Sequence, residues 1–337
     1  SSPSILFITF QLISLTIAFI VTYMQQNKKK VEFLSEGYKL LGNLFRPDNF
    51  KEGDVLPAVV MAGPMTGVKE QVAGLWAERL AKGGFVTLAF DHRNFGESEG
   101  SPRQHEDPAK KIEDLKNAIS FLASLPEVDG SRVAACGISM GGGYALQLAA
   151  WDRRIKAVSI VASGLNLGDT FLEMMGKEAL VKRLQELNAS RQKHYETGEV
   201  QYIPAVATGG KPAAMTGDEP FEYYGTSRSW SPGWVNRYTT ESIENLMSFN
   251  AVPLAHHVAP TPLLIIHGKN DKYCLPKFAQ EVYDKAGEPK EIMWVDAPNH
   301  IDLYDVEKYV EPAVNKTVEW FNKYLRGKSR LREELTA

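Results

Sequence analysis

The chain has 337 residues, of which 44% are hydrophobic, enough to bury the core of one α/β domain of about 300 residues. A formal net charge of −3 provides no basic excess and argues against nucleic acid as a partner. The two cysteines, Cys136 and Cys274, are too few for a disulfide framework. This cysteine content is compatible with a reducing compartment, and we expect the protein to be cytoplasmic.

The N-terminal segment, residues 1–27, is uncharged, and residues 5–23 form a mostly apolar run. As a helix this run would be about 28 Å long, close to the ~30 Å hydrocarbon core of a bilayer. The basic cluster at 28–30 would keep the following chain in the cytoplasm if the run is a membrane anchor. The alternative is a non-native extension, since Met24 begins a sequence that resembles a native start.

From residue 28 the sequence alternates between two kinds of predicted element. Two apolar segments on either side of Glu36-Gly37 predict a hairpin. Strands are then expected at 55–62, 85–90, 133–136, 155–162, 261–267 and 291–296, and helices at 68–82, 108–122, 144–150, 275–286 and 309–325. This order predicts an α/β fold with a mostly parallel central sheet and helices on both faces.

The alternation is interrupted between residues 164 and 260. Residues 169–199 predict one or two helices, and residues 221–238 are dense in aromatic side chains. We therefore predict a core formed by 28–163 and 261–327, an α-helical cap insertion at 164–260, and a charged tail at 328–337. The candidate substrate contacts in the insertion are Tyr224, Trp230 and Trp234, although such residues can equally form the core of the insertion itself.

One turn organises the expected chemistry. The strand at 133–136 leads into Gly137-Ile138-Ser139-Met140-Gly141, and a helical pattern follows. In such a turn the glycines remove Cβ atoms that would collide, so that the serine oxygen projects from the carboxyl end of the strand. We predict that Ser139 is a nucleophile and that the Met140 N–H donates to an oxyanion. The same pattern around Ser98 has polar neighbours and no flanking strand or helix, which indicates a loop.

A serine nucleophile needs a base, and seven histidines are present. His300 follows the last predicted strand by a short loop, where reacting groups are expected in an open α/β sheet. His267 also ends a strand and remains an alternative, but the following glycine is equally typical of a turn. His92 lies in a structured turn, and the His256-His257 pair has no suitably spaced third ligand, so no metal site is expected.

The carboxylate that orients the base is predicted to be Asp271, just after the strand at 261–267. Asp169, after the preceding strand, is the alternative. Asp91 is interpreted as a turn residue, and surface roles suit Asp302 and Asp305, which are close to His300 in sequence. The resulting order is Ser139, Asp271, His300.

Residues 31–325 resemble the α/β-hydrolase superfamily. The motifs that carry the resemblance are 90–98, 137–141, 267–271 and 299–305. Segments 67–71 and 302–305 are similar to a dienelactone-hydrolase-like branch, which includes bacterial hydrolases of unknown substrate and fungal polyketide thiohydrolases or acyl transferases. Many members have His-Gly where this chain has Gly63-Pro64. Since Pro64 has no N–H, Met65 is the candidate second oxyanion donor.

These observations predict a serine hydrolase that cleaves a carboxylic ester or thioester through an acyl-serine, with no metal or organic cofactor. The expected substrate is a small molecule with an apolar acyl or aromatic part. The alternatives are an acyltransferase that uses the same acyl-enzyme, a peptidase or amidase, and a non-catalytic binding protein on the same fold.

Overall fold

The computed structural model describes residues 27–326, so the apolar run at 5–23 and the charged tail at 328–337 lie outside the described residues. An eight-stranded sheet has the order β1-β2-β4-β3-β5-β6-β9-β10. Its strands are β1 (Lys28–Ser35), β2 (Tyr38–Phe45), β3 (Leu56–Ala62), β4 (Val86–Phe90), β5 (Val128–Ile138), β6 (Ile155–Val161), β9 (Leu263–Gly268) and β10 (Lys290–Val295). The predicted hairpin joins β1 to β2, β2 pairs antiparallel with β4, and all pairs from β4 to β10 are parallel. The prediction of a mostly parallel sheet is confirmed.

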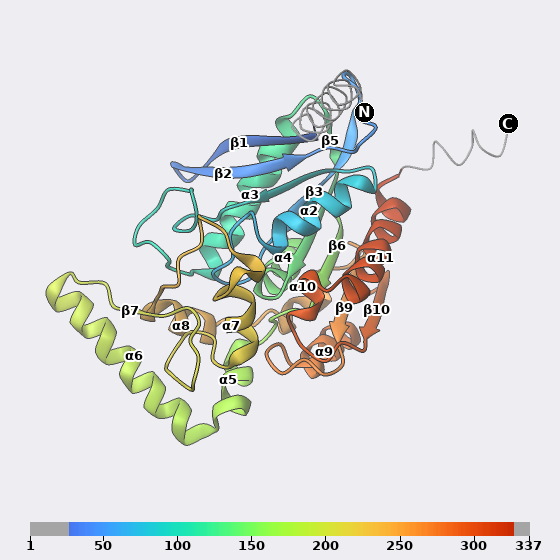
Figure 1. Cartoon of the computed structure of the whole chain (residues 1–337). Helices are drawn as coiled ribbons and strands as arrows, with labels where there is room; N and C mark the ends of the chain where they lie inside the picture. Colours follow the sequence, from blue (N-terminus) through green and yellow to red (C-terminus); the bar gives the residue numbers. More distant parts are fainter. Residues whose placement is uncertain (1–26, 327–337) are drawn as a thin grey trace, which may run out of the picture.

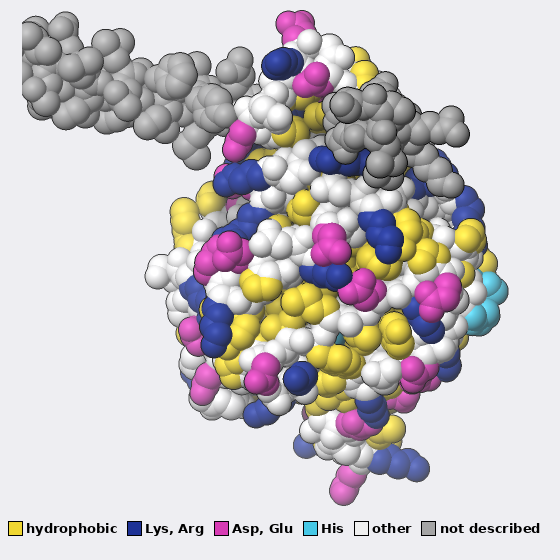
Figure 2. Space-filling view, turned by 90° about the vertical axis from the view of Figure 1, so that its right-hand side faces the viewer, with side chains coloured by type: hydrophobic (Ala, Val, Ile, Leu, Met, Phe, Trp, Pro, Cys, Tyr) yellow, Lys and Arg dark blue, Asp and Glu magenta, His cyan; other side chains and the backbone are white. Residues whose placement is uncertain are grey.

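Helices cover both faces of this sheet, as Figure 1 shows. One layer contains α3 (Pro108–Ser124), α4 (Met140–Trp151) and α9 (Pro276–Lys285), and the other contains α2 (Val72–Lys82) and α11 (Glu307–Leu325). The central strand β5 contributes to both layers because its successive side chains point to opposite faces of the sheet. Val133 and Ala135 pack in the first layer, whereas Ala134 and Cys136 pack in the second. The molecular face in Figure 2 has acidic and basic side chains interspersed.

Side-chain hydrogen bonds set two helix starts. The predicted helix at 68–82 begins only at Val72, because the Gln71 side chain accepts a hydrogen bond from the Val68 N–H and holds the preceding residues in a turn. The start at Pro108 is as predicted: the Asp107 carboxylate accepts from the N–H groups of Ala109 and Lys110, at 2.9 and 3.2 Å.

Residues 164–260, called the insertion below, connect β6 to β9. They contain α5 (Leu167–Met175), α6 (Lys177–Thr197), β7 (Tyr202–Ile203), α7 (Asp218–Tyr224), β8 (Tyr238–Thr239) and α8 (Thr240–Met247). Figure 1 shows α6 as a long helix at the margin of the molecule, and Leu187 is its one buried residue. Among the helices of residues 27–326, none has the length and apolar character needed to cross a membrane.

The backbone is closely packed at the junction of β5 with α4. Ser139 has a φ of +56°, which places it in the left-handed region. A Cβ atom on Gly141 would lie 1.9 Å from the carbonyl oxygen of Ala62, at the end of β3. A Cβ atom on Gly137 would lie 2.1 Å from the carbonyl oxygen of Gly141. The first turn of α4 therefore lies directly against the neighbouring backbone.

We expect Gly141→Ala to lower the free energy of unfolding by about 3 kcal/mol, since backbone must move to admit the methyl group. The urea midpoint at constant m value measures this change. Gly268→Ala is the control, because its Cβ would meet nothing closer than 3.8 Å, and it should change stability by less than about 1 kcal/mol. Equal midpoints for the two variants would contradict this account.

Candidate functional site

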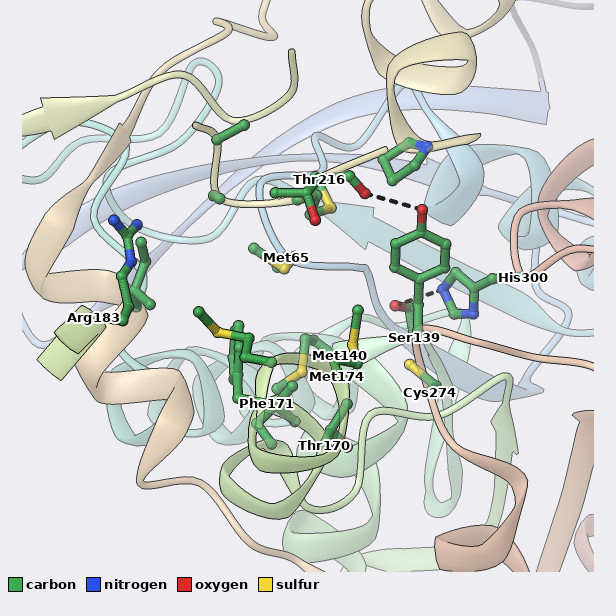
Figure 3. Close-up of a pocket in the computed structure, with 18 of the residues that line it drawn as sticks. Met65, Ser139, Met140, Thr170, Phe171, Met174, Arg183, Thr216, Cys274 and His300 are labelled. Carbon is green, nitrogen blue, oxygen red and sulfur yellow. Dashed lines mark hydrogen bonds between the residues drawn. The ribbon is translucent and has the colours of Figure 1, made fainter. Parts of the chain in front are cut away.

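The fold brings Ser139, Asp271 and His300 together from loops that follow three parallel strands, β5, β9 and β10. His300 Nδ1 lies 2.6 Å from Asp271 Oδ2, and its Nε2 lies 3.1 Å from Ser139 Oγ. Figure 3 shows the bond between Ser139 and His300 at one side of a cavity. The three side chains are buried, so the hydrogen bonds form in a region with little water.

Asp271 is held in place by backbone donors. Its Oδ1 accepts from the N–H groups of Tyr273 and Cys274, at 2.9 and 2.8 Å, which leaves Oδ2 facing the imidazole. Burial disfavours a charged imidazole, but the Asp271 carboxylate outweighs burial and holds the pKa of His300 well above its ordinary value. Burial likewise opposes ionisation of Asp271, yet His300 keeps the pKa of Asp271 below its ordinary value. With Nδ1–H donated to Asp271, the neutral imidazole presents Nε2 as an acceptor to Ser139.

The alternative base, His267, is a structural residue. Its Nε2 bonds the carbonyl oxygen of Cys274 at 2.8 Å, and its Nδ1 accepts from the N–H of Ser163 at 3.3 Å. Burial lowers the pKa of His267, which favours its neutral form. Both nitrogens are engaged with the backbone, as the turn interpretation implied. His92, His256 and His257 are absent from the cavity wall formed by the described residues.

The alternative acid and the second serine also have structural partners. Asp169 accepts from the side chain of Asn166 at 2.7 Å, at the start of α5. Ser98 Oγ donates to the carbonyl oxygen of Asp91 and accepts from the N–H of Leu41. Ser98 therefore fixes a turn, in agreement with the loop interpretation of its glycine pattern.

The expectation of a surface position was wrong for Asp302. Asp302 is 8% exposed, and its carboxylate accepts from the backbone and side chain of Asn299, which shapes the loop just before His300. Asp305 is partly buried and forms an ion pair with Arg228 of the insertion at 2.6 Å.

The backbone N–H groups of Met140 and Met65 are the predicted oxyanion donors. Met140 is the first residue of α4, so its N–H belongs to the turn that has no acceptor within the helix. Met65 lines the cavity, and within residues 27–326 its N–H has no hydrogen-bond acceptor. The next residue, Thr66, is fixed on both sides: its N–H donates to Glu106 Oε2 at 3.3 Å, and its Oγ1 accepts from Trp234 Nε1 at 3.2 Å.

The cavity has a volume of about 420 Å³ and is bounded by the core and the insertion. Figure 3 shows Met65, Met140 and Phe171 around the open space, with Arg183 far from Ser139. The described wall is mainly apolar and includes five methionines: Met65, Met140, Met174, Met175 and Met215.

The aromatic residues proposed from the sequence have different positions. Tyr224 is 4% exposed and lines the cavity. Trp234 stacks on Tyr224 with ring centroids 5.5 Å apart and lies outside the lining. Trp230 is 73% exposed and also lies outside the lining, so the proposed place in the cavity is corrected for both tryptophans. Aromatic density alone does not distinguish a cavity wall from a solvent-facing turn.

Three residues near the site were missed by the sequence analysis. Tyr304 Oη lies 3.0 Å from His300 Nε2, and Cys274 lines the cavity. Glu219 of α7 accepts from the N–H of Ile301 at 2.9 Å. Tyr304 follows His300 by four residues, but its approach to the imidazole depends on the short helix α10 (Asp302–Asp305), which the sequence analysis did not predict. No local pattern connects Glu219 with a loop 82 residues later.

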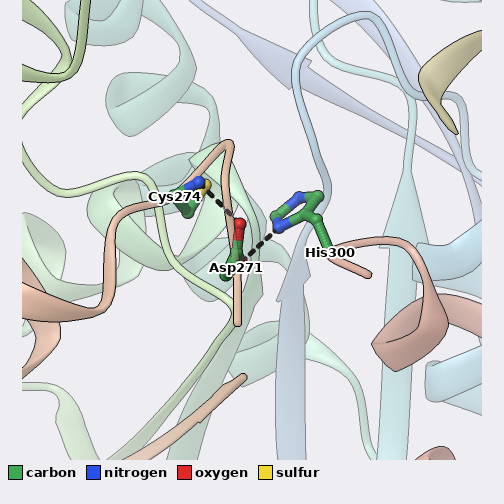
Figure 4. A group of neighbouring side chains, drawn as sticks. All are labelled: Asp271, Cys274 and His300. Atoms are coloured by element: carbon green, nitrogen blue, oxygen red, sulfur yellow. Dashed lines mark hydrogen bonds and ion pairs between the residues drawn. The ribbon is translucent and has the colours of Figure 1, made fainter. Parts of the chain in front are cut away.

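Figure 4 shows three side chains that could act as metal ligands, Asp271, Cys274 and His300. Their potential ligand atoms lie within 4.8 Å of one another. The 2.6 Å between Asp271 Oδ2 and His300 Nδ1 is a hydrogen-bond distance, whereas two such ligands of one tetrahedral zinc ion would be about 3.3 Å apart. Burial raises the pKa of the Cys274 thiol, although metal binding requires the thiolate. The arrangement fits a hydrogen-bonded chain better than a metal site.

Comparisons with known proteins agree with this architecture. The family model described as "Serine aminopeptidase, S33" matches residues 68–307. The uncharacterized protein PA2218 of Pseudomonas aeruginosa is 35% identical over 82% of this chain and 76% of its own length. Its crystal structure aligns with a TM-score of 0.77 at 33% identity, covering 88% of this chain and 94% of that one.

Two fungal enzymes are also similar over most of the chain. Thiohydrolase aneE of Aspergillus aculeatus is 29% identical, covering 91% of this chain and 97% of its own. Acyltransferase drtE of Aspergillus calidoustus is 26% identical, covering 89% and 98%. The family match agrees with the sheet order and with the loops that follow β5, β9 and β10. The chain therefore belongs to the α/β-hydrolase superfamily, in the family described as serine aminopeptidase, S33.

Proposed function

We propose that the protein is a serine hydrolase that cleaves a carboxylic ester or thioester through an acyl-serine intermediate. The observation that carries the proposal is the continuous hydrogen-bonded chain from Asp271 through His300 to Ser139, which ends in an apolar cavity. A hydroxyl, a neutral imidazole and a buried carboxylate in this order are the groups that acyl transfer to serine requires.

In the proposed reaction, Ser139 Oγ attacks the carbonyl carbon while His300 Nε2 takes its proton. Asp271 keeps the imidazole in the tautomer with Nδ1–H and stabilises the imidazolium that forms. The N–H groups of Met140 and Met65 would donate to the oxyanion, with the positive end of α4 adding favourable electrostatics. His300 then protonates the leaving group, and water attacks the acyl-serine with His300 as base.

The cavity supports an apolar acyl or aromatic substrate part. Methionine side chains are flexible and polarisable, so a wall with five of them can adapt to acyl groups of different shape. The residues of the insertion supply much of this wall, and we propose that the insertion acts as a cap. The chemistry of the proposed site needs no metal or organic cofactor.

An acyltransferase is the second candidate, because the same acyl-serine would serve and a relative of the chain carries that description. The two candidates differ only in the acceptor. A peptidase or amidase, in line with the family description, would require the same acyl-enzyme to form from an amide.

The decisive experiment is a panel of nitrophenyl esters of increasing acyl length, run beside an acyl thioester and a peptide amide. We expect turnover of the esters and thioester, with little or none of the amide, together with covalent labelling of Ser139 by a fluorophosphonate. Absence of both labelling and turnover would identify a binding protein on this fold.

Ser139→Ala should reduce kcat for a nitrophenyl ester on the order of 10⁶-fold, because the remaining groups cannot act without the nucleophile. His300→Ala should be nearly as damaging. Ser98→Ala is the matched control and should retain most activity, since Ser98 Oγ bonds only backbone groups. A reversed pattern for the two serine variants would place the nucleophile elsewhere.

The pH profile should follow the raised pKa of His300. His300 must be neutral to accept the proton, so kcat/KM should fall as pH decreases through a pKa above the ordinary value of 6.5. Asp271→Asn should lower kcat roughly 10⁴-fold and move this acid limb to lower pH, because the carboxylate that raises the pKa is gone.

Asp169→Asn is the control for the pH experiment, since it removes a carboxylate that bonds Asn166 instead of His300. It should change neither the rate nor the acid limb. If Asp169→Asn shifted the acid limb of the pH profile and Asp271→Asn did not, Asp169 would be the carboxylate that orients His300.

A further inference from the structure

The cavity wall that is far from Ser139 is charged, although most of the lining is apolar. Apart from the proposed base, the charged side chains in the described lining are Lys182, Arg183 and Glu186. All three belong to α6, and together with Ala179 they follow the i, i+3, i+4, i+7 spacing of one helix face. Helix α6 therefore turns a charged face toward the cavity, where an apolar ligand alone would favour an apolar one. Figure 3 shows Arg183 on the far side of the open space from Ser139.

The Arg183 guanidinium has spare hydrogen-bond donors. Its side chain is 20% exposed, and its one partner within residues 27–326 is Glu186, whose Oε2 lies 3.4 Å from Nη1. The Glu186 side chain is 52% exposed, so this pair is weak. A guanidinium offers five N–H donors in a planar fork that matches a carboxylate. Nε and Nη2 of Arg183 therefore have no acceptor among the described residues.

The charges on this helix face do not cancel. Glu186 can neutralise one of the two cations, and Lys182 forms no ion pair in the part of the chain that the structure describes. The wall formed by α6 consequently has one more positive charge than negative. Positive charge beside an apolar space attracts anions more strongly than the same charge in open water, because water screens it less there.

Apolar side chains separate this charged wall from the proposed nucleophile. Figure 3 shows Met65, Met140 and Phe171 around the space between Ser139 and Arg183. A ligand with its reacting carbonyl at Ser139 must therefore cross an apolar stretch before its other end reaches the guanidinium.

We propose that the protein selects substrates with a carboxylate at the end of an apolar chain, remote from the bond that is cleaved, and that Arg183 binds this carboxylate. The inference rests on the acyl-serine of the proposed function and adds a substrate class to it. The fork of Nε and Nη2 binds both carboxylate oxygens, and Lys182 adds positive charge beside it. The carboxylate can belong to the acyl part or to the alcohol part of the ester, and the experiment separates these two positions.

The test uses the full chain and matched pairs of anionic and neutral substrates. The first arm places the carboxylate on the acyl part: nitrophenyl hydrogen adipate, suberate and sebacate are compared with nitrophenyl hexanoate, octanoate and decanoate. The second arm places it on the alcohol part: butyrate esters of ω-hydroxy fatty acids are compared with butyrate esters of unbranched alcohols of the same length. In at least one arm, the unmodified protein should have a higher kcat/KM for the anionic member of a pair.

Arg183→Gln should lower the ratio of kcat/KM for the anionic to the neutral member by about tenfold. This is the low end of the effect of a hydrogen bond to a charged group, chosen because the wall is partly exposed. The ratio cancels any general effect of the substitution on catalysis.

Arg191→Gln is the control, because Arg191 lies two turns further along α6 and outside the described lining, where it pairs with Glu244 at 2.9 Å. It removes the same charge from the same helix, so a long-range field would lower the ratio in both variants. Direct binding at Arg183 predicts an unchanged ratio in Arg191→Gln. A ratio near unity in both arms for the unmodified protein, an unchanged ratio in Arg183→Gln, or equal falls in the two variants would each overturn the inference.

The proposed function fails in a different way. If the unmodified protein turns over neither member of any pair and a fluorophosphonate does not label Ser139, the acyl-serine is absent and the inference falls with it. Labelling of Ser139 without a preference for the anionic members would leave the acyl-serine in place and overturn only the role of Arg183.

Discussion

The close approach of α4 to the end of β3 is the constraint on which the site depends. Because Gly141 has no side chain, the first turn of α4 can lie against the carbonyl of Ala62. This contact holds the backbone of Ser139 in its left-handed conformation and places Met140 at the first position of α4, where an N–H has no acceptor within the helix. Packing of main chain on main chain therefore positions the proposed nucleophile and one of the proposed oxyanion donors.

A second support is the buried carboxylate of Glu106. It pairs with Lys111 at 2.7 Å, accepts from the Tyr144 hydroxyl at 2.7 Å, and accepts from the N–H of Thr66. The Glu106 N–H also donates to Ser242 Oγ in the insertion. A buried charge is stable only with such partners, and losing one of them leaves the others uncompensated. The loop that carries Met65 is therefore linked to α3, α4 and the insertion through one residue.

Much of the fold was predictable because its signals are local. Apolar strands, glycine-flanked turns and an Asp-Pro helix start depend on neighbours in sequence, and Ser139 is identified by such a pattern. Asp271 and His300 required one additional rule, that reacting groups follow parallel strands. Trp230 could not be placed in this way, since composition does not report which side of a loop faces solvent. Tyr304 required knowing that α10 begins immediately after the base.

The hydrogen bond between Glu219 and the N–H of Ile301 limits which part of the insertion can move without disturbing His300. Glu219 of α7 binds the backbone of Ile301, the residue after His300. A movement of α7 away from the core would break this bond and displace the proposed base. The cavity is also lined by Lys182, Arg183 and Glu186 of α6 and by Pro212. A movement of α6 that left α7 in place would keep the bond between Glu219 and Ile301 intact, and the proposed reacting groups would stay aligned.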